Sequence, residues 1–202
     1  MARKLLWPRK FCIEGGINIL RVISGSAKGL KLQTLEGMGT RPTTDRVKEN
    51  LFNILSPYIE NSKVLDLFAG SGSLGIEALS RGAESAVFSD QNETCIQIIK
   101  NNLEHTKLYP KSEVFLGDAE LILKKLSQHN KKFDIIFLDP PYKKNVIPLI
   151  LQYLEEHNIL EEKFIIIAET DIQDELPDNI GCMIVSKKQI YGKTKLTFYK
   201  RN

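Results

Sequence analysis

Short apolar runs alternate with helical patterns along the chain from Lys63 onward. Between predicted helices near 73–81, 91–105, 118–129 and 145–157, runs rich in β-branched or aromatic residues predict strands near 63–68, 85–90, 112–117, 133–139 and 163–169. This alternation is typical of a parallel sheet with helices on both faces. The last two runs, Met183–Ser186 and Leu196–Tyr199, leave no room for a crossover helix, so they predict an antiparallel hairpin. The expected fold is a doubly wound α/β sheet of seven strands, the last one antiparallel.

The chain before Lys63 follows a different pattern. Leu20–Ser24 and Leu30–Gln33 flank a glycine-containing turn and predict a small hairpin. A helix should follow, capped by Thr43 or Thr44 and with Asp45 in its first turn. We therefore expect a loose extension over 1–18, a hairpin and helix over 19–58, and the main domain over 59–202.

Length and composition indicate a protein with one core and no membrane-spanning segment. A chain of 202 residues with 42% hydrophobic residues can bury one sizeable core. Its apolar runs are strand-sized, far below the roughly 20 residues of a membrane span. The N-terminus lacks the apolar stretch of a signal peptide, so we expect a cytoplasmic protein with no membrane partner.

Neither cysteines nor histidines predict a metal site. The three cysteines are widely spaced without a CxxC pattern, so they suggest neither a disulfide framework nor a zinc site. His105, His129 and His157 each fall at the end of a predicted helix, where the helix dipole favours them. We expect no bound metal.

Charge is distributed unevenly. Residues 1–58 hold ten Lys or Arg against four acids, whereas the rest of the chain holds 18 basic and 21 acidic residues. A basic head on a mildly acidic body suits a protein whose head approaches a polyanion. Ordinary scatter of surface charge explains the same numbers equally well.

A glycine-rich turn follows the first predicted strand of the main domain. Gly70–Gly75 matches the G-x-G-x-x-G pattern between a strand and a helix, which by itself favours a dinucleotide. However, Asp66, Asp90, Asp118 and Asp139 all lie at or near carboxyl ends of predicted strands. Like charges about 4 Å apart repel by about 4 kcal/mol at an effective dielectric of 20, which disfavours a pyrophosphate. S-adenosylmethionine has no phosphate and offers cations, hydroxyls and an amine, so the acids favour it over NAD.

Three of these acids have a predicted partner on this cofactor. Asp66 suits the methionine ammonium and Asp90 the two ribose hydroxyls. Asp118 suits the adenine amine, although a helix N-cap accounts for it equally well. The predicted cofactor-binding residues are Asp66, Phe68, Ala69, Gly70, Ser71, Gly72, Gly75, Asp90, Asp118 and Ala119.

The strand 133–138 is apolar apart from Asp134, and it leads into Asp139, Pro140, Pro141 and Tyr142, which we predict to be catalytic. The two prolines fix the backbone and lack N–H groups, so this segment offers only acceptors. Hydrogen bonds from a base amine to the Asp139 carboxylate and Pro140 carbonyl would aim the nitrogen lone pair at the sulfonium methyl. Asp139 can then take the proton or pass it to water. Tyr142 would stack on the extruded base. The structural alternative is a proline-rich turn that closes a buried strand.

These motifs together resemble the bacterial 16S ribosomal RNA guanine-N2 methyltransferases of the RsmD type. The resemblance spans Leu20 to Lys200, and its most specific segments are Arg21–Gly25, Gly39–Glu49, Asp66–Gly75, Asp139–Tyr142 and Gln189–Thr194. It implies a Rossmann-like class I S-adenosylmethionine methyltransferase that acts as a monomer on 16S rRNA in an assembled or assembling small ribosomal subunit. It also implies RNA-binding roles for Arg21, Lys28, Arg41, Thr43, Thr44, Asp45 and Arg46.

Other functions fit the same residues. The catalytic segment also suits the amines of adenine or cytosine in DNA or another RNA. The fold could also serve an RNA-binding assembly factor without turnover. An NAD-dependent oxidoreductase fits the glycine turn but conflicts with the acids around it.

Overall fold

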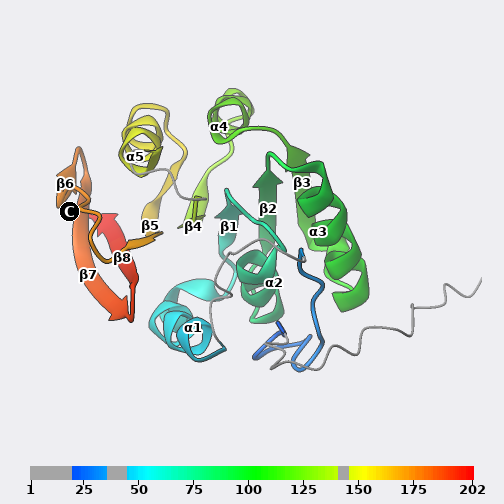
Figure 1. The fold of residues 1–202 in the computed structure, drawn as a ribbon. Helices are drawn as coiled ribbons and strands as arrows, with labels where there is room; N and C mark the ends of the chain where they lie inside the picture. Colours follow the sequence, from blue (N-terminus) through cyan, green and yellow to red (C-terminus); the bar gives the residue numbers. More distant parts are fainter. Residues whose placement is uncertain (1–19, 36–44, 141–145) are drawn as a thin grey trace, which may run out of the picture.

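The computed structural model of the protein describes residues 20–35, 45–140 and 146–202. Its centre is an eight-stranded sheet in the order β3-β2-β1-β4-β5-β8-β7-β6 (Figure 1). The strands are β1 Lys63–Asp66, β2 Ser85–Asp90, β3 Ser112–Leu116, β4 Phe133–Leu138, β5 Leu160–Asp171, β6 Asn179–Ile180, β7 Met183–Tyr191 and β8 Thr194–Arg201. The helices are α1 Asp45–Ile59, α2 Ser73–Ser80, α3 Glu93–Thr106, α4 Ala119–Gln128 and α5 Val146–Glu156, with a 3-10 turn, η1, at Tyr109–Lys111.

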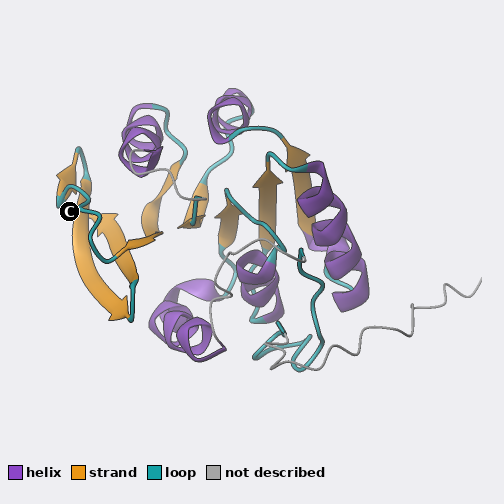
Figure 2. Ribbon diagram, in the orientation of Figure 1, coloured by secondary structure: helices purple, strands orange, loops and turns teal. Residues whose placement is uncertain are grey.

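Helices cover both faces of the sheet, as the alternating pattern predicts. Strands β1 to β5 are parallel, and β8 is antiparallel to β5. Helices α1, α2 and α3 pack on one face in the first hydrophobic core, and α4 and α5 pack on the other in the second (Figure 2). Alternate strand residues divide between the two cores, so Phe137 faces α1 while Leu138 faces the second core. The doubly wound α/β architecture is confirmed.

The sheet is longer than predicted at its C-terminal side. The strand that was not predicted is β6, which has only two residues and pairs with the start of β7. Two residues are too few to show a pattern in the sequence. Strand β5 begins at Leu160 instead of near 163 because Leu160 pairs with Phe133 before a register shift. Polar residues at 161–163 hide this start in the sequence. The predicted hairpin is confirmed as β7 and β8.

The predicted hairpin over 20–33 is confirmed in the pairing of its two arms, but these arms do not form regular strands. The described segment has a single isolated bridge, Arg21 to Lys31, and otherwise runs as a loop. Besides the backbone hydrogen bonds between its own two arms, the segment also bonds to α2: the Ser80 hydroxyl accepts from the Ala27 N–H at 2.9 Å and donates to the Ser24 carbonyl at 2.6 Å. The loop is held by side chains of a helix, which strand patterns do not encode.

A buried ion network completes this attachment. The fully buried Glu77 carboxylate of α2 accepts from the N–H groups of Ile23 and Ser24 at 2.7 and 3.0 Å. It also pairs with Lys48 of α1 at 3.3 Å and with Arg81 at 2.7 Å. Glu77 thereby joins the N-terminal loop, α1 and α2 into one body.

Several predictions concern residues outside the described ones. The extension over 1–18 and the helix caps Thr43 and Thr44 are among them. Asp45 does lie in the first turn of α1. Among the described residues, none of the helices combines the length and apolar character that crossing a bilayer requires.

Candidate functional site

Predicted site residues meet at the carboxyl ends of the parallel strands. Asp66 ends β1, Asp90 ends β2 and Asp139 directly follows β4. Strand β1 lies between β2 and β4, with Asp66 in register with Phe88 and Phe137. Carboxyl ends of open parallel sheets are where such folds bind ligands. The structure therefore brings these three acids to one side of the sheet, which we call the acidic edge.

The glycine turn lies beside the acidic edge and is bonded to it. Gly70 and Gly72 have φ angles of +55° and +77°, which residues with a side chain adopt only with strain. The Gly70 N–H donates to Asp90 Oδ2 at 2.9 Å, and the Gly75 N–H donates to Asp66 Oδ2 at 3.0 Å. Free amides of such a turn usually cradle phosphate. Because these two N–H groups already donate to carboxylates, they are not available to a pyrophosphate. The NAD alternative therefore loses support.

The last glycine of the turn serves packing. A Cβ added at Gly75 would lie only 2.3 Å from Cε1 of Phe88. The missing side chain lets α2 approach β2 closely, as in dinucleotide-binding folds. This position therefore sets how closely α2 packs against Phe88 of β2.

Asp66 is buried, and its pKa is higher than that of an ordinary aspartate. Burial raises its pKa to about 7, with further increases from the charges of Asp139 and Asp90, while the Gly75 hydrogen bond opposes them. None of the ion pairs of the described residues includes Asp66. A cationic ligand would stabilise the charged form of this carboxylate. The environment of Asp66 therefore fits an ammonium group.

Asp90 is oriented by the backbone. Its Oδ1 accepts from the Asn92 N–H at 2.9 Å, while Oδ2 accepts from Gly70. Each carboxylate oxygen can accept more than one hydrogen bond, so both oxygens remain able to bind hydroxyls. This geometry is compatible with the predicted grip on a ribose.

Asp118 lies two residues beyond β3 and caps α4. Its Oδ1 accepts from the Leu121 N–H at 2.9 Å, so the capping interpretation is confirmed. Leu116 and Leu121, on either side of it in sequence, are 53% and 57% exposed. Exposed apolar side chains next to a carboxylate provide a surface that a flat aromatic amine could cover.

The remaining predicted cofactor residues lie along the turn or at the start of α4. Phe68 and Ala119 are half-buried against the second core, and Ala69 is buried with its N–H bonded to the Ser89 carbonyl. The Ser71 carbonyl accepts from Nδ2 of Asn102 at 2.9 Å. The same Asn102 side chain bonds Gln33, so α3 links the turn to the N-terminal loop.

Asp139 has a neighbour that the sequence motifs did not indicate. Leu138 of β4 is in register with Ala168 of β5, so Asp139, directly after β4, lies next to Glu169 within β5. Although Asp139 has an exposed surface, the protein around it displaces enough water to raise its pKa to about 6. Burial and the charge of Asp139 raise the pKa of Glu169 to about 8. An acid at the end of the predicted strand 163–169 was the available signal, and Glu169 joins the acidic edge.

The catalytic segment is only partly described. Pro140 is half-buried directly after Asp139, whereas Pro141 and Tyr142 lie outside the described residues.

The predicted RNA-binding residues are likewise partly described. Arg21, Lys28 and Arg46 are exposed, and Arg21 pairs with Asp45 of α1 at 2.8 Å. Arg41, Thr43 and Thr44 lie outside the described residues. The basic side chains thus lie on the N-terminal loop and the start of α1.

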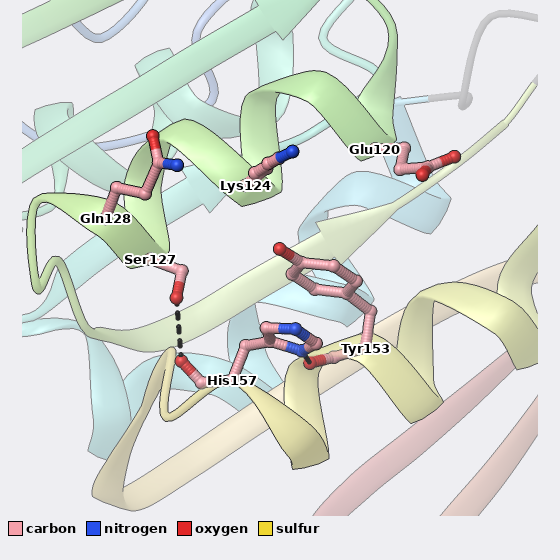
Figure 3. Close-up of a pocket in the computed structure, with 6 residues that line it drawn as sticks. All are labelled: Glu120, Lys124, Ser127, Gln128, Tyr153 and His157. Atoms are coloured by element: carbon pink, nitrogen blue, oxygen red, sulfur yellow. Dashed lines mark hydrogen bonds between the residues drawn. The ribbon is translucent and has the colours of Figure 1, made fainter.

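A separate hollow lies between α4 and α5. About 380 Å³ in volume, it is lined by Glu120, Lys124, Ser127, Gln128, Tyr153 and His157 (Figure 3). The Tyr153 and His157 rings stack with centroids 3.7 Å apart, and the Ser127 hydroxyl donates to the His157 carbonyl at 3.1 Å. It contains none of the predicted site residues. No cluster of metal-ligating side chains occurs within 20–35, 45–140 and 146–202.

Known proteins of similar sequence and structure identify the family of this chain. The family model described as "Conserved hypothetical protein 95" matches residues 20–200. YlbH of Bacillus subtilis is 45% identical over 182 residues, covering 90% of this chain and 99% of YlbH. Ribosomal RNA small subunit methyltransferase D of Haemophilus influenzae is 42% identical over 152 residues, covering 75% and 79%. The solved structure of yhhF from Escherichia coli is 31% identical with a TM-score of 0.81, covering 91% of this chain and 98% of that one. The chain therefore belongs to the Conserved hypothetical protein 95 family, the RsmD family.

Proposed function

We propose that the protein transfers a methyl group from S-adenosylmethionine to the N2 amine of a guanine in 16S ribosomal RNA. The observation that carries the proposal is the acidic edge, where acceptors surround a glycine turn whose amides bond to Asp66 and Asp90. Relatives named Ribosomal RNA small subunit methyltransferase D, at 42% and 33% identity, support a methyltransferase acting on small-subunit RNA.

The chain offers a partner for each part of the cofactor, which supplies an electrophilic methyl group on a sulfonium. Asp66 binds the ammonium, whose charge offsets the cost of ionising a buried carboxyl. Asp90 accepts from the ribose hydroxyls with an orientation set by Gly70 and Asn92. Asp118 accepts from the adenine amine while Leu116 and Leu121 flank the ring.

Asp139 and Pro140 orient the base. Their oxygens accept hydrogen bonds from the two N–H groups of the amine, so that the lone pair of nitrogen points towards the methyl carbon. A nitrogen–carbon bond forms as the sulfur–carbon bond breaks, and the electron pair of that bond stays on sulfur. The amine proton passes to Asp139 or to water. The raised pKa of Asp139, about 6, leaves it ionised at neutral pH yet better able to hold a proton than an ordinary aspartate.

The basic residues of the N-terminal loop and α1 hold the RNA in this proposal. Exposed Arg21, Lys28 and Arg46 contact phosphates, and Arg41, Thr43 and Thr44 take the roles implied by the family resemblance. The protein then acts in the cytoplasm as a monomer on an assembled or assembling small subunit.

Methyl transfer to unmodified small ribosomal subunits tests the proposal. Subunits incubated with labelled S-adenosylmethionine should carry the label on a guanine N2, as nucleoside analysis and mapping of the nucleotide would show. Label on an adenine or cytosine amine would support the alternative substrate class. Absence of label from the RNA would contradict the proposal.

Three further measurements test the remaining alternatives, an assembly factor without turnover and an NAD-dependent enzyme. Asp139→Ala should abolish transfer, whereas Asp174→Ala, a change outside the acidic edge, should leave it intact. Cellular function retained by Asp139→Ala would favour the assembly-factor alternative. Calorimetric titration should detect S-adenosylmethionine but not NAD.

A further inference from the structure

Strands β4 and β5 bring two acids together at the acidic edge. The register of Leu138 with Ala168 makes Asp139 and Glu169 neighbours across strands, which lie about 4.8 Å apart in a sheet. Ile167 faces the first core and Ala168 the second, so alternation directs Glu169 to the side of the sheet covered by α1, α2 and α3. Asp66 projects to this same side, because Val64 also faces the first core.

No basic side chain compensates this pair among the described residues. None of their ion pairs includes Asp139 or Glu169. On β8, Glu169 is opposite the buried, apolar Leu196, and the adjacent Lys195 turns to Glu175 at 3.4 Å. Two neighbouring carboxyls without a cation are stabilised when they share a proton.

The proton belongs mainly to Glu169 near neutral pH. Its pKa, raised to about 8 by burial and by the charge of Asp139, lies above that of Asp139, raised to about 6 by desolvation. Between these values Asp139 is an anion and Glu169 is a neutral hydrogen-bond donor.

We propose that Glu169 is a positioning residue of the reaction site, whose protonated carboxyl donates a hydrogen bond to the Asp139 carboxylate. This inference rests on the proposed function. A hydrogen bond to one Asp139 oxygen fixes the orientation of the other, which accepts from the amine. Glu169 is therefore needed in its neutral form, and its ionisation would place a second negative charge beside Asp139.

Three variants test this role in the methyl-transfer assay. Glu169→Ala removes the donor and should lower kcat about tenfold, the value of one hydrogen bond to a charged group. Glu169→Gln keeps a neutral donor and should retain kcat within about threefold at pH 7, since the hydrogen bond remains. Glu162→Gln is the matched control because Glu162 is exposed at the other end of β5.

The pH profile distinguishes positioning from a structural contribution. Wild-type kcat should fall as pH rises above about 8, where Glu169 loses its proton. Glu169→Gln cannot ionise, so it should keep its activity over the same range. Unchanged kcat in Glu169→Ala, or the same alkaline decline in wild type and Glu169→Gln, would overturn the inference.

The test also separates this inference from the proposed function. A wild-type protein that methylates no RNA contradicts the proposed function, and an NMR titration of the carboxyl carbons then decides the state of Glu169. A carboxyl that titrates near pH 8 in the wild type and is missing in Glu169→Gln supports a protonated Glu169 beside Asp139. Titration near 4.5, the ordinary value for glutamate, overturns it.

Discussion

Replacing Glu77 by glutamine tests the buried network that attaches the N-terminal loop. Lys48 and Glu77 are both fully buried, and their charged atoms lie 3.3 Å apart. Glu77→Gln preserves shape but removes the negative charge. Lys48 would then keep only uncharged acceptors, the Arg21 carbonyl and the amide oxygen of the new glutamine. Breaking a buried pair on one side costs about 3 to 5 kcal/mol, and we expect a loss of unfolding free energy in this range.

The pH dependence of stability gives this prediction a second signature. Burial lowers the pKa of Lys48 from 10.5, and the charge of Glu77 opposes that decrease. Without Glu77 the folded-state pKa falls further, so the folded protein binds fewer protons than the unfolded chain. The stability of Glu77→Gln should therefore rise with pH until the unfolded value of 10.5 is reached.

Urea unfolding followed by circular dichroism measures both effects. Glu104→Gln on the exposed side of α3 is the control and should change stability by less than about 0.5 kcal/mol. Adding Lys48→Met to Glu77→Gln should recover part of the loss because the unpaired cation is removed. A loss below about 1 kcal/mol for Glu77→Gln, the range of exposed pairs, would refute the argument.

Three further predictions concern the site. Asp66 has a folded pKa of about 7 against 3.8 in the unfolded chain, so its ionisation makes stability fall as pH rises between these values. Asp66→Asn should remove that fall in urea unfolding while weakening S-adenosylmethionine in calorimetry; an unchanged affinity would exclude an ammonium contact. Asp118→Ser should keep the cap of α4 but weaken the cofactor, whereas equal affinity would leave Asp118 as a cap alone. Arg46→Ala should make the plot of log affinity for RNA against log salt concentration less steep, by about the amount that one phosphate contact contributes. An unaltered slope would show that Arg46 is not part of the RNA interface.

The sequence determined the parts of the protein that depend on neighbouring residues. Alternating apolar runs predicted the parallel strands and covering helices, because side-chain periodicity reflects which faces are buried. Gly70–Gly75 and Asp139 were recognisable because a strand end, a turn and their side chains are adjacent in the chain. Asp66 and Asp90 were predicted at one sheet edge because carboxyl ends of parallel strands meet there.

Tertiary structure alone decided the contacts between distant segments. Glu169 stands beside Asp139 because Leu138 and Ala168 are paired in register, which no local pattern specifies. Glu77 lies within a helix pattern, and only packing reveals that its carboxylate binds the loop backbone and Lys48 instead of water. Such contacts depend on strand register and helix packing, so their charges and proton affinities emerge only when the separated segments are brought together.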